Sequence, residues 1–327
     1  MFRVCKIVTV RQKTGDWLRQ YGSATLLAVA VLAGLLAGAL FPSDGLPAVR
    51  SFVLGWPAEY LVIAPFFFLV GLELRREFSH GALKPIRNAS SPFLAACLGV
   101  ALPALWYLVL NHGAAAAAGW PIPTATDVTF ALVVYTAFGS ALPRGARTFL
   151  LAFAVIDDLI AVLLITLVFG FSADSGFAEL IPVALAFVIP LRWPTRVEKH
   201  LLTYLNLVGL PLFAFFMSAV NLPPLAVMAS SLIFWGVVLR PVWKWAGVFI
   251  GGLIGQRWAT GEMRVGTKVL ARVALLGGIG FTVSLLVAGI AFKADGEAFA
   301  AALLATFIAS GASALVAAVA LVRSHRS

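Results

Sequence analysis

Four ionisable side chains interrupt long apolar runs of this sequence: Asp127, the adjacent Asp157 and Asp158, and Lys244. A charge at the centre of a bilayer costs roughly 2.5 to 3.5 kcal/mol even on the lenient insertion scale, so such residues usually face a cavity or a partner. Oxygen ligands bind either a proton or a small hard cation. These acids therefore predict a site at which the two species compete.

Asp157 and Asp158 are the pair best suited to this competition. Adjacent side chains on a helix point about 100° apart, so the two carboxylates cannot fill the same role. Burial and a neighbouring carboxylate raise a carboxyl pKa, whereas a nearby ammonium lowers it, and together they bring protonation towards physiological pH. The alternative is structural, a salt bridge with Lys244 that only locks the helices together.

Asp127 and Lys244 also have structural alternatives. Asp127 is a suitable cap for the amino end of a half-helix, a role compatible with transport. Lys244 is able to face a helix carboxyl end, or to snorkel towards an interface. Thr126 adds a hydroxyl beside Asp127, although threonine is ordinary in membrane helices. Arg240 lies one turn before Lys244, and the sequence assigns it no role.

The composition of the chain excludes a soluble globular protein. Of its 327 residues, 61% are hydrophobic and 12% are charged, and apolar runs of about 20 residues recur along it. We predict an all-α polytopic membrane protein with about ten spans, at 22–41, 52–72, 91–110, 121–139, 146–171, 177–191, 201–220, 232–256, 270–292 and 297–322. The lipid bilayer, rather than nucleic acid, is the expected partner of the basic residues.

The positions of Lys and Arg predict the orientation of these spans. Twenty of the 24 basic residues fall in alternate connections and in the two termini, which the positive-inside rule places in the cytoplasm. We therefore expect a multi-pass protein of the plasma (inner) membrane. Residues 1–21 form a cytoplasmic segment, 22–322 a single transporter domain, and 323–327 a cytoplasmic tail.

Two triplets of spans, within 91–171 and 232–322, run in opposite directions under this topology. The middle span of each contains a stretch unfavourable for helix, with two prolines at 121–127 and three glycines at 277–282. Inverted repeats with interrupted helices at matching positions are how many secondary transporters build a site near the bilayer midplane. Broken backbone at that depth must line a cavity.

Several strings of residues resemble the NhaA family of sodium/proton antiporters. They are FLVGLELRRE at 68–77, ATDVTFAL at 125–132, IDDL at 156–159, LPLFAF at 210–215 and GIGFTVS at 278–284. The similarity extends from about residue 60 to the carboxyl terminus. It implies electrogenic exchange, in which protons enter and Na⁺ or Li⁺ leaves by alternating access, and no cofactor beyond these transported ions.

The resemblance also implies roles for individual residues. Asp158 is similar to the principal ion-binding carboxylate of the family, Asp157 to its lysine-pairing neighbour, and Asp127 and Lys244 to residues that offset the dipoles of crossed, unwound helices. The positions associated with pH regulation at the cytoplasmic funnel are matched by Glu73, Arg76, Glu77 and Glu198.

Departures from the family are expected in its helices and in its dimer contact, among others. Between Phe171 and Arg192 there is room for one apolar segment where the family has three, so two helices are predicted to be absent. The connection from Pro42 to Arg50 is too short for the extracellular hairpin through which family members dimerise. A homodimer therefore stays an open alternative to a monomer.

Other functions fit the residues less well. A channel needs a continuous polar pore, and an intramembrane enzyme needs a further acid at helical spacing, which is missing after Asp158. Sodium-coupled symport of an organic anion, and a degenerate relative that does not transport, remain the alternatives.

Overall fold

The computed structural model describes residues 90–139, 141–169, 203–218, 222–259, 264–293 and 295–323, together with 26, 29, 30, 32–34, 36, 68 and 200. All regular structure in these residues is helical, which confirms the all-α class. The predicted spans 52–72 and 177–191 and the residues Glu73, Arg76, Glu77 and Glu198 lie outside them, apart from residue 68 in the first. The span at 22–41 is described at only a few helical positions.

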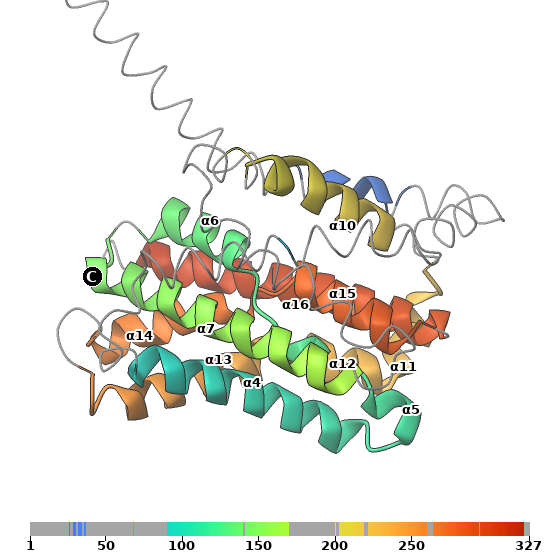
Figure 1. Ribbon diagram of the computed structural model, residues 1–327, viewed down its shortest axis with the longest axis horizontal. Coiled ribbons are helices and arrows are strands. Elements are labelled where there is room, and N and C mark those ends of the chain that lie inside the picture. Colours follow the sequence, from blue (N-terminus) through green and yellow to red (C-terminus); the bar gives the residue numbers. More distant parts are fainter. Residues whose placement is uncertain are drawn as a thin grey trace, which may run out of the picture.

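In chain order, the first triplet contains a continuous helix before and after a broken one, and Figure 1 shows the two continuous helices side by side. Its elements are α4 (Ser90–Leu110), the short helix α5 (Ala114–Ala117), the 3-10 turn η2 (Ile122–Thr124), α6 (Val128–Phe138) and α7 (Arg144–Phe169). Helices α4 and α7 agree with the predicted spans 91–110 and 146–171 to within two residues. The break predicted at 121–127 is present between η2 and α6.

The rest of the described chain has more breaks than the sequence predicted. Its elements are the π turn η5 (Leu205–Gly209), α10 (Leu210–Ser218), α11 (Leu225–Ser230), α12 (Leu232–Val238), α13 (Arg240–Gly255), α14 (Thr267–Ala274), the 3-10 turn η7 (Leu275–Gly278), α15 (Thr282–Ala291) and α16 (Gly296–Val322). The predicted span 232–256 is bent by 42° between α12 and α13. The prediction of a single helix over this range is wrong, because Pro241 removes a backbone donor at the start of α13.

Membrane-crossing length is met by several of these elements. Helices α4 and α16 are each long and apolar enough to cross a bilayer, and the bent pairs α12 with α13 and α14–η7 with α15 raise the number to as many as four among the described residues. The second pair is bent by 44°. The chain is thus a helical membrane protein.

Helices α4 and α13 pack antiparallel through small residues. A Cβ atom added to Gly247, Gly251 or Gly255 would lie 2.1 to 2.5 Å from a backbone oxygen of α4. The hydroxyls of Ser90 and Ser91 donate to carbonyls of Gly255 and Gly252. Such small-residue interfaces let membrane helices approach closely. The contact fixes α13, and with it Arg240 and Lys244, against the first triplet.

Basic residues gather at one end of the bundle. Helices α4 and α7 begin at the end where α13 and α16 finish (Figure 1). The basic residues next to these helix ends and in α14 are Arg144, Arg147, Arg257, Arg264, Lys268, Arg272 and Arg323, whereas Lys293 follows α15 at the opposite end. This is the distribution that the predicted topology requires.

Candidate functional site

The two broken segments contact each other at their extended residues. The first leaves η2 and is extended at Ala125 before α6. The second leaves η7 and is extended at Ile279 before α15. The backbone N–H of Asp127 donates to the carbonyl oxygen of Ile279 at 2.7 Å. A Cβ atom on Gly280 would lie 2.1 Å from the carbonyl oxygen of Ala125, so only glycine permits this approach.

Asp127 serves the amino ends of two helices. One carboxylate oxygen accepts the backbone N–H of Phe130 in α6 at 3.3 Å. The other accepts the hydroxyl of Thr282 at 2.9 Å and the Thr282 backbone N–H, in the first turn of α15, at 3.4 Å. The predicted cap is therefore confirmed for α6, and the same buried carboxylate also faces α15. A negative charge is favourable at both positions because helix amino ends carry partial positive charge.

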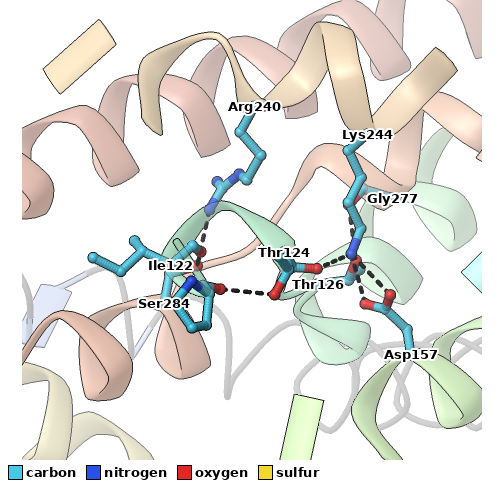
Figure 2. A network of polar contacts seen from close by, with 9 residues as sticks. Ile122, Thr124, Thr126, Asp157, Arg240, Lys244, Gly277 and Ser284 are labelled. Atoms are coloured by element: carbon cyan, nitrogen blue, oxygen red, sulfur yellow. Dashed lines mark hydrogen bonds and ion pairs between the residues drawn. The ribbon is translucent and has the colours of Figure 1, made fainter. Parts of the chain in front are cut away.

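Lys244 and Asp157 form a buried ion pair. The Nζ atom of Lys244 lies 2.8 Å from each carboxylate oxygen of Asp157, and neither side chain is exposed. The same ammonium donates to the carbonyl oxygen of Thr124 in η2. Figure 2 shows the lysine descending from α13 between the turn and the aspartate of α7. The pair thus ties three elements together at the broken segment.

Asp158 and Thr126 flank this ion pair. Asp158 is half-buried on α7 and interacts electrostatically with Lys244. Thr126 interacts with the Asp157 carboxylate, and its hydroxyl donates to the carbonyl oxygen of Gly277 at 2.8 Å. The structure therefore pairs Lys244 with Asp157, while Asp158 interacts with the same ammonium only electrostatically. The Asp127 carboxylate does not join that contact and instead accepts hydrogen bonds from Phe130 and Thr282.

Arg240 lies at this site although sequence analysis assigns it no role. Its side chain has no exposed surface, and its two terminal nitrogens donate to the hydroxyls of Ser284 at 2.9 Å and Ser310 at 2.8 Å. Those serines are 44 and 70 residues away in the chain. The available signal was an arginine within an apolar run, which is costly without partners.

The arrangement suits reversible binding of a small cation or a proton. Two carboxylates occupy consecutive positions of α7, one fully buried against an ammonium and one half-buried. Adding a proton or a cation changes the charge that Lys244 balances. Among the residues with assigned structure, no three His, Cys, Asp or Glu side chains gather into a ligand cluster of the kind that holds a resident metal.

Comparison with known proteins connects this geometry to a family. The model of the family described as Na⁺/H⁺ antiporter 1 matches residues 48–181 and 171–321. The chain is similar to Na⁺/H⁺ antiporter NhaA 2 of Clavibacter michiganensis subsp. michiganensis, with 34% identity over 93% of this chain and 91% of the relative. It is also similar to the Na⁺/H⁺ antiporters NhaA of Frankia casuarinae, at 35% identity over 83% of this chain and 77% of the relative, and of Cronobacter sakazakii, at 32% over 94% and 95%.

The same comparisons show that the alignment with a relative contains gaps in this chain. The two stretches of the family match overlap at residues 171–181, at the start of the region where two helices are expected to be missing. The alignment with the Clavibacter relative extends over 374 positions, more than the 327 residues of this chain. It therefore includes positions for which this chain has no residue.

Proposed function

Since this chain belongs to the family of NhaA sodium/proton antiporters, we propose that Na⁺ and H⁺ exchange across the membrane at its Asp157–Asp158 pair. Sodium/proton antiport follows from the family. The finer assignment rests on one observation, the buried contact of Lys244 with Asp157 beside the crossing of the two broken segments. Asp158, half-buried next to this pair, is the principal cation ligand, and Na⁺ or Li⁺ is the transported ion.

Asp157 and Lys244 respond to the occupancy of that ligand. A buried ion pair is sensitive to charge in its surroundings because its desolvation is offset only by good geometry. Binding Na⁺ at Asp158 adds a positive charge near the ammonium and weakens its hold on Asp157. Protonation neutralises a carboxylate in a different way, because the proton needs no coordination by further oxygen ligands. Competition between the two ligands couples their movements in opposite directions.

The broken segments allow the site to be reached from each side in turn. The triplets 91–171 and 232–322 are the inverted repeats of this proposal, and their broken members meet at Asp127 and Ile279. In transporters of this kind, alternating access is a rocking or gating of one repeat against the other around a fixed site. Exchange is electrogenic, because two carboxylates are able to take up more than one proton for each Na⁺ released.

The end of the bundle that carries most of the described basic residues faces the cytoplasm in this proposal, as the positive-inside rule requires. Both termini then lie inside, and the protein resides in the inner membrane. Glu73, Arg76, Glu77 and Glu198 are proposed to line the cytoplasmic approach and to tune the response to pH. The protein works without a bound cofactor.

Transport in proteoliposomes tests the proposal. The purified protein is placed in liposomes with an imposed pH gradient and a fluorescent pH probe, and Na⁺ or Li⁺ is added. Wild type should dissipate the gradient, and an imposed membrane potential should change the rate. Asp158→Asn should abolish the response, because an amide cannot exchange a proton or offer a full negative charge.

Asp295→Asn is the matched control. Asp295 caps α16 by accepting the backbone N–H of Ala298 at 3.0 Å, far from the crossing, and asparagine caps helices about as well. Its transport should equal that of wild type. No response of wild type to Na⁺ or Li⁺ at any pH between about 6 and 9, a range that spans ordinary catalytic pKa values, would refute antiport.

A further inference from the structure

Two buried cations on α13 reach opposite ends of the same short turn. Arg240 and Lys244 lie one helical turn apart and neither has exposed surface. Lys244 donates to the carbonyl oxygen of Thr124, the last residue of η2. Arg240 donates to the hydroxyl of Ser284, which in turn donates to the carbonyl oxygen of Ile122, the first residue of η2, at 2.9 Å. Figure 2 shows both side chains pointing at the turn.

The second arm of Arg240 reaches the other broken segment. Its Nη2 atom donates to the hydroxyl of Ser310 on α16, and that hydroxyl donates to the carbonyl oxygen of Gly280 at 2.8 Å. One guanidinium therefore connects α13, through two serines, to a carbonyl of each broken segment. Lys244 contacts only the first segment directly.

The chemistry of the guanidinium suits this bridging. Arginine presents several donors in a rigid planar fork, whereas lysine offers a single compact ammonium on a flexible stem. Both terminal nitrogens of Arg240 donate to serine hydroxyls rather than to a carboxylate, and Asp127 interacts with the guanidinium only electrostatically. The ion pair of Lys244 contains Asp157, an acid of the exchange site. The Thr124 end of η2 is therefore exposed to the change of charge that accompanies binding of a cation or a proton. The Arg240 end does not contain such an acid.

We propose that Arg240 is a positioning residue for cation binding, which holds the Ile122 end of η2 and the Gly280 end of the second segment in fixed register through Ser284 and Ser310. When ion binding changes the contact between Lys244 and Asp157, the Ile122 and Gly280 ends of the two segments then keep their positions. This inference rests on the proposed antiport, because it concerns the residues that position the same exchange site.

The test separates cation affinity from turnover and from stability. Ser284→Ala, Ser310→Ala and Arg240→Lys are compared with wild type in proteoliposomes, measuring KM for Na⁺, maximal rate and thermal unfolding in detergent. A hydrogen bond to a charged group contributes enough to predict a rise of about tenfold in KM for each serine variant. The maximal rate should change far less. Arg240→Lys should also raise KM, because lysine keeps the charge and loses the fork.

Thr306→Val is the matched control. Thr306 lies on α16 one turn before Ser310, it is fully buried, and its hydroxyl has no hydrogen-bond partner among the residues that the structure describes. Valine preserves its shape, so KM should stay at the wild-type value.

Several outcomes would overturn the inference. They are a KM within twofold of wild type in both serine variants, a lowered unfolding temperature without a change of KM, an equal rise of KM in Thr306→Val, or full retention of wild-type KM in Arg240→Lys. If Arg240→Lys does not fold, the serine variants decide. Wild-type liposomes without a Na⁺ response would refute antiport and this inference together, whereas transport with unaltered serine variants would refute only the inference.

Discussion

The two broken segments of this protein have similar shapes but different electrostatic support. Turn η2 receives the ammonium of Lys244 on the carbonyl of Thr124, and its segment ends at the charged Asp127. Segment 275–281 is held by four neutral donors, namely the hydroxyl of Ser313 on Leu275, that of Thr126 on Gly277, the backbone N–H of Asp127 on Ile279 and the hydroxyl of Ser310 on Gly280. The first segment therefore has charged side chains at its contacts, whereas the donors to the second segment are neutral.

The same asymmetry appears at the helix amino ends. Helix α6 begins with its own carboxylate cap, whereas α15 follows Phe281 and has no side-chain cap of its own. Thr282 instead donates to the aspartate of the first segment. The sharing places the negative charge on one side only. Two broken segments can thus have similar shapes while only one of them supplies the carboxylate that faces both helix amino ends.

The largest effect is expected from breaking the ion pair on the charged side. Lys244→Met leaves Asp157 buried without its ammonium, and removing one partner of a buried pair costs about 3 to 5 kcal/mol. The double variant Asp157→Asn with Lys244→Met should recover most of that stability, since neither charge remains. Thermal and denaturant unfolding of the purified protein measures both.

Lys293→Met supplies the control for this pair of variants. Lys293 is an exposed lysine after α15, so its replacement should leave the unfolding temperature nearly unchanged. A double variant that is no more stable than Lys244→Met would show that the ion pair is not what stabilises the first segment. The first segment would then not differ from the second in depending on charge for its stability.

A smaller effect is expected from crowding the neutral side. Gly280→Ala places a Cβ atom 2.1 Å from the carbonyl oxygen of Ala125, so the two backbones must separate. Overpacking of this kind costs about 1 to 3 kcal/mol, and the shift should weaken transport as well. Gly311→Ala on α16 is matched, because nothing lies within 4 Å of its added Cβ. Equal unfolding temperatures of the two variants would contradict a close crossing at Gly280.

The sequence predicted the positions of the two helix breaks better than the hydrogen-bond partners that join distant segments there. Pro121, Pro123 and the glycines at 277–280 are local signals, because each weakens helix wherever it occurs. They located both breaks correctly. Asp127 was correctly expected as a cap because an acid directly before a helical run is itself a local signal.

The partners of Arg240 depend on contacts between distant segments. Ser284 and Ser310 are ordinary serines in apolar helices, and nothing near them in the sequence connects them to an arginine 44 or 70 residues earlier. The bend at Leu239 was missed for a related reason, since Pro241 is tolerated in the first turn of a helix and also permits a new start there. The choice of Asp157 over Asp158 as the partner of Lys244 came from the resemblance, because a 100° difference in direction does not decide it.

Two threonines join the segments, and the smallest effect of all is expected at Thr126. Thr282→Val removes a hydroxyl that donates to the charged Asp127, so it should destabilise the protein by about 1.5 to 3 kcal/mol, the range for hydrogen bonds to charged groups. Thr126→Val removes a donor to the neutral carbonyl of Gly277 and should cost about 1 kcal/mol. Valine preserves the shape of threonine in both variants. Because Thr126 also interacts with the Asp157 carboxylate, the comparison measures each threonine's whole contribution to the link between the segments.

Thr136→Val is the control for these two substitutions, since its hydroxyl donates to Leu132 four residues earlier on the exposed side of α6. It should lower the unfolding temperature less than either of them. If Thr126→Val proves more damaging than Thr282→Val, the neutral contact would be the stronger link between the segments. The asymmetry of charge would then have no counterpart in stability, and the shared carboxylate would matter for transport alone.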